Sequence, residues 1–228
     1  MHLLAIDSST SAGSVALLDD DKIIAQSILN LEQTQSQRLM PQIITLLENS
    51  NYEIEQLSGL GVGVGPGSFT GIRIGVSTAC GLAQALSIPI AGVSTLESMA
   101  YNLSYISGYI CPIIKSNRNY VFAALFSGMD KGLKREFADS LITVDNLIKE
   151  LKLIKEPIYV VGDLKKYQSD LEAELNDCRL VSGEFSFPNP IAIARLAQEK
   201  IAQGNNKSLY QITPNYLKRP QAEIDWAK

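Results

Sequence analysis

The chain has 228 residues, of which 46% are hydrophobic and 19% are charged. This composition can fill a packed core, and it excludes an intrinsically disordered chain. The net charge of −4 is uneven, because residues 1–107 hold three basic and nine acidic side chains, whereas residues 108–228 hold 17 and 15. The first half should repel a phosphate backbone, so any nucleic-acid contact has to come from the second half or through a partner.

Cysteine and histidine are too few for several kinds of site. Cys80, Cys111 and Cys178 lie far apart and form no CxxC pair, which argues against a zinc site or a disulfide framework. His2 is the only histidine, so a histidine metal site or a Ser–His or Cys–His catalytic pair is nearly excluded unless His2 serves. No apolar stretch reaches about 18 residues and no basic leader opens the chain, so we expect a cytoplasmic protein without a membrane segment.

Alternating apolar runs near the start predict three antiparallel strands joined by tight turns. The expected strands are residues 2–6, 14–18 and 22–28. A helix should follow, because leucine and isoleucine recur at three- and four-residue steps between residues 39 and 47. Ser36 is a candidate cap, and Pro41 requires either a start near Met40 or a distorted first turn.

A polar turn at residues 7–10 is the first candidate for chemistry. Its residues are Asp7, Ser8, Ser9 and Thr10. A carboxylate and hydroxyls on such a turn can hold phosphate oxygens, or water on a metal ion. The same residue types also form ordinary turns, in which they satisfy local backbone amides.

A glycine-rich loop at residues 65–71 is the second candidate. It follows a predicted strand over residues 57–64 and opens a helix that should run to about Leu86. Free amides at the helix start, with Arg73 in the first turn, would favour an anion. However, the Gly-Lys-Ser/Thr of a phosphate loop is missing, and so is the third glycine of the dinucleotide pattern. The glycines are therefore read as permitting a tight turn and close packing.

Small residues recur every four positions on two faces of this helix. The two stripes are Gly71, Gly75, Ala79 and Ala83, and Ser77, Gly81 and Ala85. A glycine inside a helix costs about 1 kcal/mol relative to alanine, so close packing against another helix should offset it. The packing partner is either the helix near residues 39–47 of this chain or a helix of another subunit. Both contacts occur together if the two helices of this chain form half of a four-helix contact.

The pattern of strands and helices restarts near residue 107, after a predicted strand at 88–93 and a capping box at Ser94 and Glu97. The expected strands of the second half are residues 109–114, 120–126 and 158–161, and the expected helices are 144–153, 169–175 and 191–202. Two α/β lobes follow, residues 1–107 and 108–228. The irregular tail at 213–220 either stays with the second lobe or returns to the first.

Residues 63–75, with the sequence GVGPGSFTGIRIG, resemble the signature of the bacterial TsaB (YeaZ) family. Four shorter matches occur in the right order, so that the likeness covers essentially the whole chain. They are LLAIDSST at 3–10, SxxLxP at 36–41, VSTLE at 93–97 and PxYL at 214–217.

The resemblance implies a two-lobed α/β fold of the sugar kinase/Hsp70/actin (ASKHA) type, with mixed sheets flanked by helices. It also implies an accessory, noncatalytic subunit for making threonylcarbamoyladenosine in tRNA. In that scheme a TsaD homologue binds the metal and transfers the threonylcarbamoyl group, the ATPase TsaE joins a ternary complex, and tRNA is met indirectly. This chain would hold no metal, no catalytic residue and no cofactor, with ATP and Mg²⁺ at most in the assembled complex.

The resemblance places the contact with TsaD on the helices that begin near Ser36 and Thr70. The expected interface residues are Ser36, Leu39, Met40, Ile43, Leu47, Thr70, Gly71, Ile74, Gly75, Thr78 and Ala79. Whether the isolated chain forms a homodimer through the same helices stays open.

The chain departs from the family pattern at three positions. Gln35 stands where the family usually has histidine, and Lys115 and Tyr120 stand where it has acids. The loss of a general acid or base makes catalysis within this chain less expected.

Two other functions stay in view. A stand-alone ATP-dependent phosphotransferase of the same fold would use Asp7 and the turn after it to hold phosphates and Mg²⁺. A peptidase, the old glycoprotease label of related proteins, would need an activated nucleophile or a metal-bound water.

Overall fold

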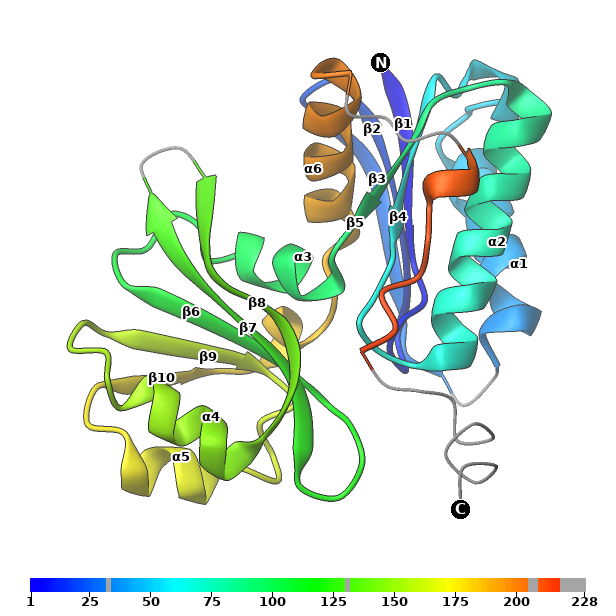
Figure 1. Ribbon diagram of the computed structural model, residues 1–228. Coiled ribbons are helices and arrows are strands. Elements are labelled where there is room, and N and C mark those ends of the chain that lie inside the picture. Colours follow the sequence, from blue (N-terminus) through cyan, green and yellow to red (C-terminus); the bar gives the residue numbers. More distant parts are fainter. Residues whose placement is uncertain (32–33, 130–131, 205–208, 218–228) are drawn as a thin grey trace. The chain divides into compact units, whose positions relative to one another are not determined.

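The computed structural model describes residues 1–31, 34–129, 132–204 and 209–217. The chain forms two compact units. The first consists of Met1–Ser98 and Pro188–Asn215, and the second consists of Met99–Phe187 and the described residues from Tyr216 onward. Each unit is built on one five-stranded sheet, as Figure 1 shows.

The sheet of the first unit has the strand order β3-β2-β1-β4-β5. Its strands are β1 (His2–Asp7), β2 (Gly13–Asp19), β3 (Lys22–Leu29), β4 (Gly59–Gly63) and β5 (Ile90–Val93). Short polar turns join β1, β2 and β3, which therefore pair antiparallel, as the sequence predicts. Both β4 and β5 follow a helix. Strand β4 pairs parallel with β1, and β5 pairs parallel with β4.

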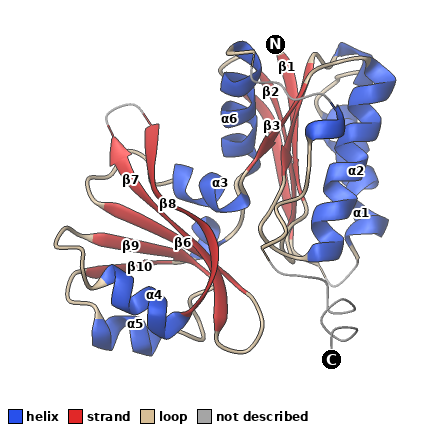
Figure 2. Cartoon of the chain, viewed as in Figure 1, coloured by secondary structure: helices blue, strands red, loops and turns tan. Residues whose placement is uncertain are grey.

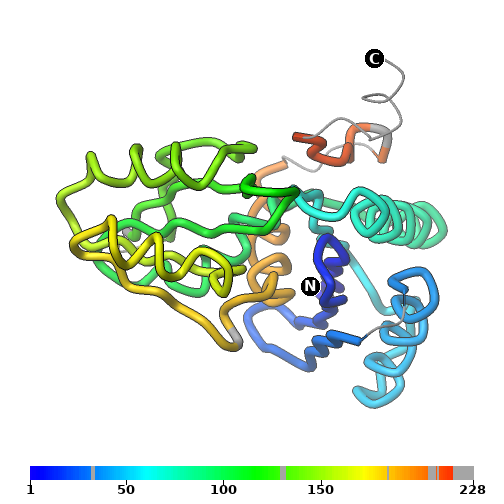
Figure 3. The backbone as a smooth tube through the Cα atoms, turned by 90° about the horizontal axis from the view of Figure 1, so that it is seen from below, coloured from blue at the N-terminus to red at the C-terminus, as the bar shows by residue number. Residues whose placement is uncertain are grey.

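Helices cover both faces of this sheet. One face carries α1 (Gln35–Asn49) and α2 (Phe69–Leu86), and the other carries α6 (Pro190–Ala202), as the views in Figures 1 and 3 agree. Successive side chains of β1 point to opposite faces, so Leu4 packs with α1 and α2 whereas Leu3 packs with α6. Both faces are apolar, which explains the unbroken hydrophobic run at the start of the chain.

Helix α1 begins at Gln35, well before Pro41. Its cap is Thr34, whose backbone N–H donates to Gln37 Oε1 at 3.4 Å, and not Ser36, which lies in the first turn. Pro41 lies inside the helix, so the predicted start near Met40 is wrong. The proline removes one hydrogen bond, and burial of the apolar face of α1 offsets that loss.

The sheet of the second unit has the order β10-β9-β6-β7-β8. Its strands are β6 (Tyr109–Lys115), β7 (Tyr120–Met129), β8 (Gly132–Thr143), β9 (Ile158–Gly162) and β10 (Cys178–Val181). The strands β6, β7 and β8 pair antiparallel, and β9 and β10 continue the sheet in parallel. Figure 2 shows this mixed sheet with α4 (Val144–Leu151) and α5 (Gln168–Glu174). Two mixed sheets with helices confirm the predicted α/β class.

Residues 188–215 belong to the first unit, although the sequence places everything after residue 107 in the second lobe apart from a returning tail. Ile193, Ala194 and Ala197 of α6 are fully buried against the first sheet. Further along, Asn215 donates its backbone N–H to Val64 O at 2.7 Å. Of the predicted irregular tail, residues 218–220 lie outside the described residues.

Candidate functional site

The polar turn after β1 is closed on itself. Asp7 has no exposed surface. Its Oδ1 accepts from the backbone N–H and the hydroxyl of Ser9 at 2.8 and 2.7 Å, and its Oδ2 accepts from Thr95 Oγ1 at 3.1 Å. Burial raises the pKa of this carboxyl, and the hydrogen bonds from Ser9 and Thr95 oppose the rise.

The neighbours of Asp7 are also engaged within the unit. Ser8 Oγ donates to Gly71 O at 2.7 Å, and Thr10 Oγ1 donates to Ala12 O at 3.2 Å. The four residues predicted as cofactor-binding candidates therefore do come together, but as a packed turn. A nucleotide phosphate or a hydrated Mg²⁺ on Asp7 does not fit, because both carboxylate oxygens are buried and already accept hydrogen bonds.

The glycine-rich loop brings α2 against this same turn. Ser68 caps α2, since its Oγ accepts from Gly71 N at 3.2 Å, and its own N–H donates to Ser9 O at 2.6 Å. A Cβ on Gly67 would lie 2.2 Å from Ser9 O, and one on Gly71 would lie 2.0 Å from Ser8 O. These positions need glycine because the backbone of the loop touches the backbone of the turn. The loop glycines thus permit close packing, as the packing interpretation predicts.

The two small-residue stripes of α2 have different environments. Gly71, Gly75, Ala79 and Ala83 are buried. A Cβ on Gly75 would meet Ser8 Oγ at 2.4 Å, so this stripe packs on its own chain. Ser77, Gly81 and Ala85 are exposed, and nothing lies within 4 Å of a Cβ placed on Gly81.

The predicted interface residues divide in the same way. Leu39, Ile43, Leu47 and Ala79 belong to the hydrophobic core of the first unit, and Gly71 and Gly75 are buried under the turn. At the surface or half-buried remain Ser36, Met40, Thr70, Ile74 and Thr78. These five still lie on the two neighbouring helices, but they are the part of the set that a partner can reach.

One exposed apolar residue on α1 is missing from the predicted set. Ile44 is 47% exposed, and it follows directly after the buried Ile43. The signal was in the sequence, because an isoleucine next to the stripe rather than on it must point away from the core. We call the surface formed by Met40, Ile44, Ile74, Thr78 and Gly81 the helix-pair face.

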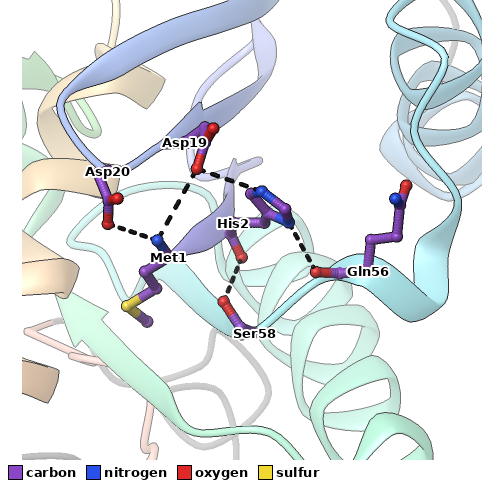
Figure 4. A network of polar contacts seen from close by, with 6 residues as sticks. All are labelled: Met1, His2, Asp19, Asp20, Gln56 and Ser58. Atoms are coloured by element: carbon purple, nitrogen blue, oxygen red, sulfur yellow. Dashed lines mark hydrogen bonds and ion pairs between the residues drawn. The ribbon is translucent and has the colours of Figure 1, made fainter.

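His2 is half-buried and is held by contacts at both ring nitrogens. Its Nδ1 lies 3.0 Å from Gln56 O and its Nε2 lies 3.2 Å from Asp19 Oδ1, as Figure 4 shows. The ring also makes an edge contact with Tyr52, with ring centroids 5.1 Å apart. Both ring nitrogens are therefore occupied where β1 begins.

The three thiols are free cysteines. Burial raises the pKa of Cys111 to about 12 and that of Cys178 to about 11, and it also raises the pKa of Cys80. Such thiols are protonated at neutral pH, and thiolates are the reactive form. Among the described residues, no group of three or more histidine, cysteine, aspartate or glutamate side chains could hold a metal ion. None of the described helices has the length and apolar character needed to cross a bilayer.

Comparison with known proteins gives full-length relatives. Residues 22–226 match the sequence model of a family described as "TsaD: tRNA N6-adenosine threonylcarbamoyltransferase". The "tRNA threonylcarbamoyladenosine biosynthesis protein TsaB" of Bacillus subtilis is 33% identical over 99% of this chain and 98% of its own length. The protein of the same name in Escherichia coli is 29% identical over 100% and 98%.

A solved structure shows the same fold. The structure of YeaZ from Pseudomonas aeruginosa has a TM-score of 0.78 and 22% identity, and the match covers 95% of this chain and 99% of that one. The predicted fold class is confirmed by this likeness and by the two mixed sheets.

Proposed function

Because this chain belongs to the TsaB (YeaZ) family of tRNA threonylcarbamoyladenosine biosynthesis proteins, we propose that it is the noncatalytic subunit that binds a TsaD homologue and supports the transfer to tRNA. The observation that carries the proposal is the helix-pair face. It presents apolar side chains of α1 and α2 beside small ones, on helices fixed by a buried core. Such a face suits close packing against helices of a second protein.

The groups that could perform chemistry are engaged elsewhere, which supports a noncatalytic role. The carboxylate of Asp7 accepts hydrogen bonds from Ser9 and Thr95, and both ring nitrogens of His2 lie within hydrogen-bond distance of protein oxygens. The raised thiol pKa values leave Cys111 and Cys178 protonated. A stand-alone phosphotransferase would have to open the packed turn first, and a peptidase would need a nucleophile that these residues do not supply.

The partners follow from the same proposal. TsaD supplies the metal and the transfer step, TsaE joins as the ATPase of a ternary complex, and tRNA is engaged within that assembly. The chain itself holds no ATP or Mg²⁺ through Asp7, and it acts in the cytoplasm without membrane contact. A homodimer of the isolated chain would use the helix-pair face and would compete with TsaD.

The test is assembly with the TsaD homologue of the same organism, measured by size-exclusion chromatography with light scattering. Ile44→Asp should weaken the complex by about tenfold or more, because it places a charge in a desolvated contact. Ile23→Asp is the matched control, since Ile23 on the edge strand β3 is 45% exposed and Ile44 is 47% exposed. Equal effects of the two variants would contradict the helix-pair face.

Two further measurements decide between functions. A tRNA modification assay that lacks only this chain should fail, and normal activity without it would refute the accessory role. Calorimetry of the isolated chain with ATP and Mg²⁺ should show no tight binding. Tight binding would favour the phosphotransferase instead.

A further inference from the structure

Two segments that are far apart in the sequence meet at the edge of the second sheet formed by the carboxyl ends of β6 and β9. Because β6 and β9 pair in parallel, the loop after Lys115 and the turn after Gly162 lie side by side. Three hydrogen bonds join them: Asp163 N donates to Ile113 O at 3.1 Å, Lys115 N donates to Asp163 Oδ2 at 2.9 Å, and Lys166 Nζ donates to Arg118 O at 2.5 Å.

This edge carries four exposed basic residues, which we call the basic patch. They are Lys115, Arg118, Lys165 and Lys166. Among the described residues none of the four makes a salt bridge. Two acids are tied to the patch by hydrogen bonds of the same segments: the carboxylate of Asp163 accepts from Lys115 N, and Asp145 follows a residue whose N–H donates to Asn119 O.

Of the six other basic residues that the structure describes in the second unit, four are paired with carboxylates. The paired residues are Lys134 with Glu136, Arg135 with Asp139, Lys152 with Glu174, and Arg179 with Asp177. Within the described ranges Lys149 on α4 and Lys155 in the loop after it make no salt bridge either, but they stand apart in the sequence from both segments of the patch. Four of the six described basic residues of this unit that lack a carboxylate partner therefore belong to the patch.

The same edge presents groups that recognise bases. Tyr120, at the end of the loop, is 44% exposed, and its backbone N–H donates to Asn117 O at 3.0 Å. Asn117 and Asn119 are exposed beside it. Unpaired cations with an exposed aromatic ring and amide side chains are the combination with which proteins bind phosphates and stack unpaired bases of RNA.

We propose that the basic patch and Tyr120 form an RNA contact, with the cations on phosphates and the ring against a base. The identity of the RNA as tRNA rests on the proposed function, whereas the existence of the contact rests on this geometry. An acidic protein surface would also be attracted by the charge, but it would offer the ring no base to stack on.

The test is fluorescence anisotropy with an unmodified transcript of a substrate tRNA, over about 50 to 200 mM salt, for the chain assembled with its TsaD homologue. The variant carries Lys115→Gln, Arg118→Gln, Lys165→Gln and Lys166→Gln. Each lost phosphate contact lowers the slope of log affinity against log salt by about 0.7 to 0.9. For four lost contacts we expect the slope to fall by about 2.8 to 3.6 and the Kd to be at least about tenfold higher.

The paired basic residues provide a control with the same change in net charge. It carries Lys134→Gln, Arg135→Gln, Lys152→Gln and Arg179→Gln, and it should keep the Kd and the slope within about twofold. In the patch, the charge-keeping exchanges of lysine for arginine and arginine for lysine should retain most of the affinity. Tyr120→Phe should bind as the unaltered chain does, and Tyr120→Leu should bind about three- to tenfold more weakly.

The outcomes separate the two proposals. If the assembly forms but the patch variant binds tRNA with unchanged Kd and slope, or if the control loses as much, the patch is refuted and the proposed function stands. If polyglutamate of matched charge competes as well as RNA, an acidic protein partner replaces RNA. If no complex forms with the TsaD homologue, the proposed function fails, and the same titrations on the isolated chain still decide the patch.

Discussion

The substitutions Gly75→Ala and Gly81→Ala test which face of α2 packs within this chain and which face is open to a partner. Both glycines lie inside the helix, so either substitution gains about 1 kcal/mol of helix propensity. The added Cβ meets different surroundings, however. At Gly75 it would lie 2.4 Å from Ser8 Oγ, and at Gly81 nothing lies within 4 Å.

The cost at Gly75 can be worked from the neighbouring hydroxyl. Ser8 Oγ is buried and donates to Gly71 O at 2.7 Å, so displacing it loses a hydrogen bond of about 1 kcal/mol. Overpacking adds about 1 to 3 kcal/mol. After subtraction of the propensity gain, Gly75→Ala should lower the free energy of unfolding by about 1 to 3 kcal/mol, whereas Gly81→Ala should raise it by up to about 1 kcal/mol.

Urea and thermal unfolding of the two variants measure this difference of about 1 to 4 kcal/mol, which corresponds to roughly 2 to 16 °C in Tm for a chain of this size. Adding Ser8→Ala should relieve the Gly75→Ala variant, because the atom that clashes is then gone. The reasoning is refuted if Gly75→Ala is as stable as Gly81→Ala, or if Ser8→Ala brings no relief.

Three other properties follow from buried groups. Burial raises the pKa of Asp7 in the folded chain above 3.8, so its contribution to stability is full below pH 3.8 and is lost as the pH rises through the folded pKa. Urea unfolding between pH 3 and 7 should therefore show the free energy of unfolding falling with pH in the unaltered chain, and this fall should be absent in Asp7→Asn. The hydroxyl of Tyr167 is buried without a partner among the described residues, so Tyr167→Phe should leave the Tm unchanged or raise it by a few degrees, and a clear loss would reveal a missed hydrogen bond. With a pKa of about 11, Cys178 should be about 0.1% thiolate at pH 8. In a Cys80→Ser chain, iodoacetamide should therefore label Cys178 about 100-fold more slowly in the folded protein than in the unfolded one. Fast labelling of the folded protein would contradict the raised pKa.

The family resemblance read from residues 63–75 is confirmed by full-length relatives. That stretch was informative because backbone contacts with Ser8 and Ser9 leave no room for side chains at Gly67 and Gly71. Residue spacing alone could not say which small-residue stripe of α2 points inward. The same periodicity is produced by a helix packed on its own sheet and by one packed on a partner, so several core residues entered the predicted interface.

Two strands of the second sheet have no clear signal in the sequence. Strand β8 is mostly half-exposed and carries charged residues at its middle, and β10 has only four residues at an edge, so neither shows the apolar run of a buried strand. The start of α1 could not be fixed from the sequence, because Pro41 is compatible both with a start near Met40 and with an earlier start capped near Ser36. The basic patch depends on the parallel pairing of β6 with β9, which joins segments about 50 residues apart and has no local signature.

The place of α6 in the first unit has a consequence for biosynthesis. The apolar side chains of Leu3, Ala5 and Val93 are covered by Ile193 and Ala197, which leave the ribosome about 100 residues after β5 has been made. At translation rates of about 5 to 20 residues per second, that face of the sheet stays uncovered for roughly 5 to 20 s. During this interval the nascent chain offers a ready target for a holdase chaperone, and a stop codon before residue 188 would leave the sheet permanently exposed to aggregation.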